Sequence, residues 1–176
     1  MDAATRHLIL EWLGAQDGVV ESSGRLTHRD LMRVMVRSTA IDALNALPVE
    51  RAAKALHVPA SVCQQMIDSG HLWSYNLGSG PRIPTWQLTR RSSGAPAIPI
   101  SEALPIVVAA IPAGESPAFI RHLMNVEHGA LLDGDNQPVT PRRWLLAGLP
   151  PWPVVCILLS ATGGDVEAAA ASFMKE

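Results

Sequence analysis

This sequence of 176 residues is poor in the side chains that build disulfide scaffolds and zinc modules. Its two cysteines, Cys63 and Cys156, form no Cys-x-x-Cys pair and have no histidine at ligand spacing. Small secreted scaffolds and zinc modules carry several cysteines at short intervals. We therefore expect two reduced thiols, buried as small apolar side chains, with a disulfide between them as the alternative.

The chain also lacks the short motifs that hold cofactors or perform catalysis. It has no G-x-G-x-x-G or phosphate-binding loop, no nucleophile elbow, and only scattered histidines. Asp133, Asp135 and Gln137 begin like a calcium-binding loop, but its twelfth position is Trp144 instead of glutamate. The sequence therefore predicts no cofactor, no metal ion, no catalytic residue and no enzymatic activity.

Charged residues are scarce, at 17% against 48% hydrophobic residues, so the chain can bury a core. The most membrane-like stretch, residues 144–162, is uncharged but contains three clustered prolines, which a spanning helix tolerates poorly. It predicts two buried helices joined by a proline-rich turn. Because acidic residues surround the first apolar run, we expect no signal peptide and a cytoplasmic protein.

The two halves of the chain differ in charge. Residues 1–91 carry 10 basic and 8 acidic side chains, whereas residues 92–176 carry 4 and 8. A contact with DNA is therefore expected in the first half. Four arginines recur at every fourth position there: Arg25, Arg29, Arg33 and Arg37. They indicate either a ridge that contacts phosphates or an ordinary solvated helix face.

Hydrophobic periodicity and breaker residues predict a mainly α protein. We expect an N-terminal helical segment over 1–47, with its second helix ended by Pro48, and a winged helix-turn-helix over 48–91. RRSSGAPAIP indicates a linker, with the domain boundary at 92–100. A small C-terminal helical domain follows over 101–176, with a loop at 129–138.

Residues 48–91 read as helix, tight turn, helix and β-hairpin. The helices are expected over 49–56 and 60–69, and the hairpin strands over 71–77 and 82–88. On the second helix, Val62, Met66 and Ile67 are expected to point inward and Ser61 is a plausible N-cap residue.

The expected DNA contacts lie on the second helix and around the hairpin. Glutamine can pair with the N6/N7 edge of adenine, and cations near the hairpin can hold phosphates. The predicted set is Ser61, Gln64, Gln65, Arg82, Arg90 and Arg91. No lysine or arginine lies on the second helix itself.

AAKALHVP, SGHLWSYNLGSG and RIPTWQL make residues 48–88 resemble the excisionase-type, MerR-like winged helix-turn-helix family. That resemblance implies binding to double-stranded DNA. Residues 116–161 resemble the C-terminal toxin-binding domain of Xre/MbcA/ParS-type antitoxins, through Asn125, the Leu131–Gly134 motif LLDG, and Thr-Pro-x-x-Trp-Leu-Leu-x-Gly over 140–148. This second resemblance implies a partner toxin, commonly of the RES type, which consumes NAD.

Three apolar residues are candidates for the partner contact: Trp144, Leu145 and Trp152. They could equally be ordinary core. The leading hypothesis is a bacterial antitoxin that represses its own operon and binds DNA as a homodimer. The alternatives are a protein-interaction module in which the helix-turn-helix is a scaffold, or a phage excisionase-like factor that bends DNA.

Overall fold

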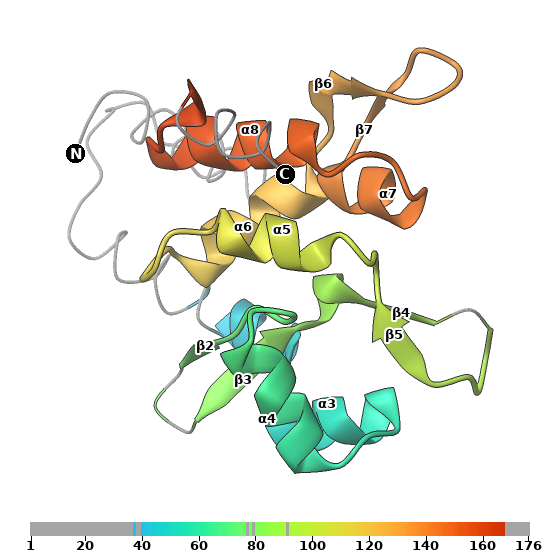
Figure 1. Ribbon diagram of the computed structural model, residues 1–176, viewed down its shortest axis with the longest axis vertical. Coiled ribbons are helices and arrows are strands. Elements are labelled where there is room, and N and C mark those ends of the chain that lie inside the picture. Colours follow the sequence, from blue (N-terminus) through green and yellow to red (C-terminus); the bar gives the residue numbers. More distant parts are fainter. Residues whose placement is uncertain (1–36, 38–39, 77, 79, 91, 168–176) are drawn as a thin grey trace. The chain divides into compact units, whose positions relative to one another are not determined.

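The computed structural model describes residues 37, 40–76, 78, 80–90 and 92–167 (Figure 1). Contacts within the chain divide it into Met1–Arg37 and Ser38–Glu176, and the fold described is that of the second unit. Several predictions concern residues that the structure does not describe. They are the helices expected before residue 37, the arginines Arg25, Arg29 and Arg33, the arginine Arg91, and most of the helix expected at the C-terminal end of the chain.

Two short helices form the first part of this unit, and both lie where the sequence predicts. Helix α3 spans Val49–Leu56 and helix α4 spans Ala60–Asp68. His57 adopts the left-handed conformation at φ 58°, and Pro59 is the N-cap residue of α4. Gly70, at φ +73°, follows α4 as expected for a residue that ends a helix.

In helix α4, Met66 and Ile67 are partly buried against the core, as predicted. Cys63 is fully buried, whereas Val62 is 37% exposed, so the inward orientation predicted for Val62 is wrong. In α3, Val49 and Leu56 are partly buried against the core, and the small residues Ala52 and Ala53 are buried. Close helix packing favours a small residue opposite them. Ser61 is not the N-cap either, since Pro59 holds that position.

Three strands pair in the order β1-β3-β2, with all pairs antiparallel. Strands β2, Tyr75–Asn76, and β3, Pro81–Pro84, form the predicted hairpin, and β1 is Ala46–Pro48. The helix expected to reach residue 47 instead ends near Leu44. The reason is pairing: Leu47 lies opposite the fully buried Ile83, so the chain gains a strand there.

The strand expected over 82–88 is interrupted. It divides into β3, the short 3-10 helix η1 at Thr85–Gln87, and β4 at Leu88–Arg90. Trp86 and Gln87 of η1 are both buried. The buried Gln87 amide accepts from the backbone N–H of Trp73 at 2.6 Å and donates to its carbonyl at 2.8 Å.

Residues 92–100 are not a free linker between two modules. They contain strand β5, Ala97–Pro99, which pairs with β4, and Ala97 and Ile100 are buried. Serine, glycine and proline are common both in linkers and in turns, and here they form the turn of the β4–β5 hairpin. The apolar residues that follow them enter the core. The domain boundary expected here is therefore not visible as a break in packing.

Between residues 101 and 163, the C-terminal part consists of helices and one hairpin: α5 Leu104–Ala109, α6 Pro117–Asn125, β6 His128–Leu132, β7 Pro138–Val139, α7 Pro141–Leu146 and α8 Trp152–Thr162. The Thr140 side chain caps α7 by accepting from the N–H of Arg143 at 3.0 Å, and Pro141 takes the first helical position, where proline is favoured. The expected loop at 129–138 is instead the β6–β7 hairpin. The fold therefore combines helices with small antiparallel sheets.

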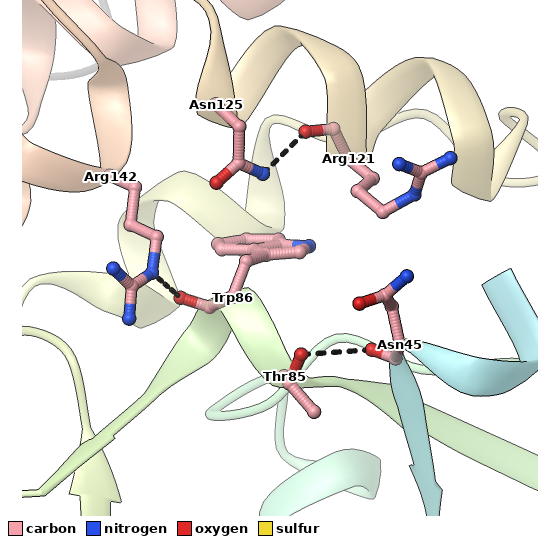
Figure 2. Close-up of a pocket in the computed structure, with 6 residues that line it drawn as sticks. All are labelled: Asn45, Thr85, Trp86, Arg121, Asn125 and Arg142. Carbon is pink, nitrogen blue, oxygen red and sulfur yellow. Dashed lines mark hydrogen bonds between the residues drawn. The ribbon is translucent and has the colours of Figure 1, made fainter. Parts of the chain in front are cut away.

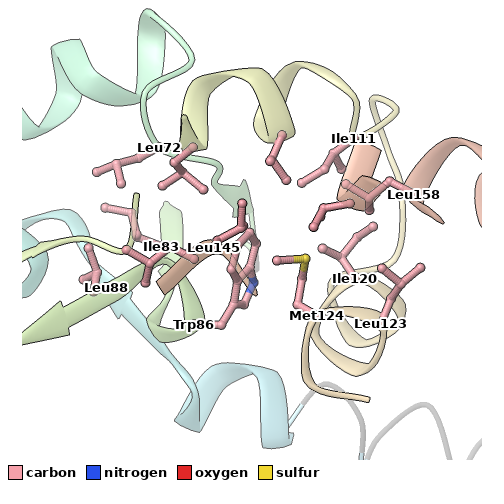
Figure 3. Packing of buried hydrophobic residues seen from close by; sticks show 14 of the residues in the cluster. Leu72, Ile83, Trp86, Leu88, Ile111, Ile120, Leu123, Met124, Leu145 and Leu158 are labelled. Atoms are coloured by element: carbon pink, nitrogen blue, oxygen red, sulfur yellow. The ribbon is translucent and has the colours of Figure 1, made fainter. Parts of the chain in front are cut away.

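One hydrophobic cluster runs through both parts of the unit (Figure 3). It joins Cys63, Leu72 and Ile83 of the first part to Leu104, Ile120, Met124, Leu145 and Leu158 of the second. Residues 144–162 form two helices with a proline turn, as predicted. Over the described residues, none of the helices has the length and apolar character needed to cross a membrane.

Two arginines tie distant segments together. Arg121 of α6 donates from Nε to Asp42 Oδ1 at 2.8 Å, and the Asp42 side chain is only 6% exposed. Arg142 of α7 donates from Nε to the Trp86 carbonyl at 3.1 Å and from Nη2 to the Leu88 carbonyl at 3.3 Å. These bonds anchor the C-terminal helices on η1 and on the segment before β1.

Candidate functional site

The outward side of α4 carries Ser61, Val62, Gln65 and Asp68, which we call the α4 face. All four are exposed. Figure 1 shows the α3–α4 pair at one end of the unit, with the β2–β3 and β4–β5 hairpins on either side in that view. The α4 face therefore presents a hydroxyl, an apolar branched side chain, a carboxamide and, toward the end of the helix, a carboxylate.

Gln64 is differently placed from Gln65. Its amide nitrogen donates to Asp68 Oδ1 at 2.8 Å along the helix, and the side chain is half-buried. This bond uses one of the two amide N–H hydrogens and directs the side chain along the helix. Of the two predicted glutamines, Gln65 is the one whose side chain projects into solvent.

The three arginines expected around the hairpin fall in different places. Arg82 lies on β3 opposite Tyr75 and is half-buried, and Arg90 is exposed at the end of β4. Arg91 lies outside the described residues. Exposed cations on α3, Arg51 and Lys54, add to Arg90 on the described surface.

Arg82 is also part of a small cluster of interacting polar and charged groups around Tyr75. The Tyr75 hydroxyl donates to the Asp42 carbonyl at 2.9 Å. Burial and the negative charge of Asp42 raise the pKa of Tyr75 to about 12, although Arg121 and Arg82 oppose the shift. Burial likewise raises the pKa of the Cys63 thiol above its usual value, which suits a packing role.

The predicted partner residues are not a shared exposed stripe. Leu145 is fully buried, so its assignment as a contact residue is wrong: it faces the core from α7. Trp144 is half-buried and donates from Nε1 to the Pro150 carbonyl at 2.7 Å, which secures the turn before α8. Trp152 is half-buried at the start of α8.

An apolar groove of about 540 Å³ lies instead between α8 and β6. Most of its lining is apolar, with His128, Ala130, Pro153, Cys156, Ile157, Ser160 and Ala161 around it. Sequence periodicity missed this surface because α8 is apolar on nearly every side, so no single face stood out.

A second hollow, which we call the junction cavity, has a polar lining. It is lined by Asn45, Thr85, Trp86, Arg121, Asn125 and Arg142 (Figure 2). These residues come from four segments that are far apart in the sequence, and their spacing carries no motif. Only the fold brings them together, so sequence reasoning could not have found them.

No metal-binding group of three or more histidine, cysteine or acidic residues occurs among the described residues. The Asp133 carboxylate serves its own turn, accepting from the N–H groups of Asp135 and Gln137 at 3.0 Å each. Those bonds, the Gln137 one foremost, lower its pKa. Both cysteines are free, with Cys63 buried and Cys156 half-buried.

Comparison with known proteins found no matching family model, no matching curated protein and no matching solved structure.

Proposed function

We propose that this chain is a DNA-binding transcriptional regulator that reads base edges with α4. The observation that carries the proposal is the arrangement of α3, a three-residue turn and α4, followed by the β2–β3 hairpin. In a helix-turn-helix, the first helix supports the second. The second helix exposes side chains that can form hydrogen bonds with base edges. The α4 face meets the second requirement with Gln65 and its neighbours.

Three residues of the α4 face, all except Asp68, have distinct expected roles. The Gln65 carboxamide donates and accepts at once and pairs with the N6/N7 edge of adenine. The exposed methyl groups of Val62 suit the methyl group of thymine. Ser61, in the first turn of α4, is placed to bond a phosphate or a base edge. The face therefore favours A·T pairs.

Phosphate contacts must come from outside α4, which has no basic residue. Arg51, Lys54 and Arg90 are the exposed cations on α3 and β4. Three phosphate contacts per copy predict that log K falls with log salt with a slope of roughly −3 per bound copy. Because three phosphate contacts give only weak binding, we expect a homodimer on two half-sites, in which the contacts of both copies add.

The experiment is selection of bound duplexes from a random pool, followed by affinity measurement on the selected sequence and on the DNA upstream of the chain's own reading frame. Gln65→Ala should weaken specific binding about tenfold, since a good bidentate base contact is worth about 1–3 kcal/mol. Gln137→Ala, the same change on the exposed turn between β6 and β7, is the control and should leave affinity unchanged. Selection that yields no enriched sequence would overturn the proposal.

A second function, binding of a protein partner through the C-terminal part, is favoured by the apolar groove between α8 and β6. The resemblance of residues 116–161 to antitoxin domains makes a RES-type toxin the expected occupant. Together the two functions describe an antitoxin that represses its operon and neutralises its partner.

The test of this second function is co-purification with the toxin encoded beside the chain. Ala161→Arg places a charge in the groove from an exposed position on α8 and should abolish co-purification. Ala147→Arg, at an exposed position after α7 and outside the groove, should leave it intact. Equal retention of the partner by both variants would exclude the groove as the contact.

A further inference from the structure

The apolar groove between α8 and β6 is long enough to hold a short peptide segment. Figure 1 shows α8 beside the β6–β7 hairpin, and the groove lies where α8 meets β6. Its helical wall runs from Pro153 to Ala161, which corresponds to about 12 Å at about 1.5 Å per residue. Ile157 of α8 and Ala130 of β6 also line it. A groove of this length takes about two turns of a helix or about four residues of an extended chain.

The lining of the groove is uncharged. Among the described residues, no lysine, arginine or carboxylate lines it, and helix α8 has the sequence WPVVCILLSAT. Of its polar lining residues, His128 bonds through Nε2 to the Leu123 carbonyl at 3.3 Å, and Cys156 is a half-buried free thiol. A charge buried here would find no opposite charge in the lining. The occupant therefore places apolar side chains in the groove.

The C-terminal part that contains the groove is acidic at its surface. Residues 101–167 contain seven acidic residues and three arginines. Five of the acidic residues are exposed: Glu102, Glu127, Asp135, Asp165 and Glu167. An apolar groove within such a surface is best covered by a partner that brings positive charge beside its apolar side chains.

The three arginines of this part do little to offset the acidic residues. Arg121 pairs with Asp42, and Arg142 bonds to backbone carbonyls in η1 and β4. Arg143 is exposed, but it lies 3.6 Å from the carboxylate of Asp133. The negative charge of the exposed carboxylates is therefore left largely uncompensated at the surface.

Some of these carboxylates lie close to the groove in the chain. Glu127 directly precedes the lining residue His128, and Asp165 and Glu167 follow the lining residue Ala161 by four and six positions. Exposed charges interact over about 8 Å at physiological salt. Cations that flank an apolar segment in the groove are therefore attracted at both its β6 and its α8 side.

We propose that the groove binds a segment of a protein partner whose apolar side chains are flanked by lysine or arginine. The apolar side chains enter beside Ile157 and Ala130, and the flanking cations lie near Glu127 and the acidic residues after α8. The inference rests on the second proposed function, because it names the chemistry of what the partner places in the groove. A second copy of this chain is disfavoured, since it would bring the same acidic surface and repel.

The test is a fluorescence anisotropy titration of the full chain with two labelled amphipathic peptides of about 14 residues. Both have the same leucine positions, and the other positions are lysine in one and glutamate in the other. We expect the lysine peptide to saturate one site and to bind at least about tenfold more tightly than the glutamate peptide. Raising the salt concentration about tenfold should weaken the lysine peptide several-fold.

Two matched pairs of variants locate the binding. Ala161→Arg places a charge in the groove and should abolish binding of the lysine peptide, whereas Ala147→Arg adds the same charge outside the groove and should change its affinity less than about twofold. Glu127→Lys should weaken the peptide about threefold. Glu102→Lys, the same change at an exposed residue that does not line the groove, should have a smaller effect.

Three results would overturn the inference: equal affinity of the two peptides, equal loss in Ala161→Arg and Ala147→Arg, or sedimentation that shows self-association of the chain which Ala161→Arg abolishes. The last result would make a second copy the occupant. Co-purification of the toxin is measured separately. A chain that retains the toxin but does not distinguish the peptides refutes only the charge preference, and one that binds the lysine peptide without retaining the toxin refutes only the second proposed function.

Discussion

The α4 face and the junction around Asp42, Trp86 and α6 differ in their basic residues. The α4 face carries no basic side chain, although it is the surface we propose for DNA. The junction holds Arg121 and Arg142, which bond inward to Asp42 and to backbone carbonyls. The arginines of this region therefore mostly bond to interior groups, and the proposed binding to DNA would depend on cations flanking α4.

This comparison predicts that junction residues control stability and α4 residues control DNA binding. The largest effect on stability is expected for Leu145→Ala, at about 3 kcal/mol, because it empties a fully buried site. Leu146→Ala, one position along α7 and 39% exposed, should cost well under 1 kcal/mol. Urea unfolding of the two variants measures the contrast. Equal costs would show that α7 is packed differently from the structure.

Arg121→Ala should destabilise by about 2 kcal/mol, since it leaves the Asp42 carboxylate buried without its cation. We take a value below the usual range because the Arg121 side chain is 24% exposed. Arg143→Ala is the matched control: its pair with Asp133 spans 3.6 Å at the surface and should contribute under about 0.5 kcal/mol. A loss for Arg143→Ala as large as that for Arg121→Ala would contradict the junction account.

Tyr75 reports on the junction by its titration, and it is the single tyrosine of the chain. With a pKa of about 12 when folded and about 10 when unfolded, the neutral phenol is favoured by folding. Its stabilising contribution is complete below pH 10 and is lost as pH rises toward 12. Phenolate absorbance at pH 11 should be low in buffer and nearly full in denaturant. Asp42→Asn should lower the folded pKa.

The helices of this fold were largely predictable from local signals. Thr140-Pro141 marked the start of α7, and Gly70 marked the stop after α4. Long-range pairing was not predictable. Nothing near Leu47 indicated that it would face Ile83 in a sheet, or that the linker-like segment would supply β5.

The candidate site was predictable only in part. The sequence indicated the second helix of the motif and the burial of Cys63, but it also predicted that Val62 points inward, whereas Val62 is exposed. The orientation of Val62 depends on how closely α3 approaches, which is a property of the packed pair. The junction cavity depends on Asp42 meeting Arg121 across 79 positions, a contact that no local pattern encodes.

We propose that α4 contacts the bases and that cations outside α4 contact the phosphates. The most direct test of this division is the salt dependence of binding to the selected duplex. Gln65→Ala should shift the plot of log K against log salt down by about one decade and leave its slope unchanged. Arg90→Ala should reduce the magnitude of the slope by about 1 per copy. An α4 variant that changes the slope but not sequence preference, or an Arg90→Ala plot identical to that of the unaltered chain, would contradict the account.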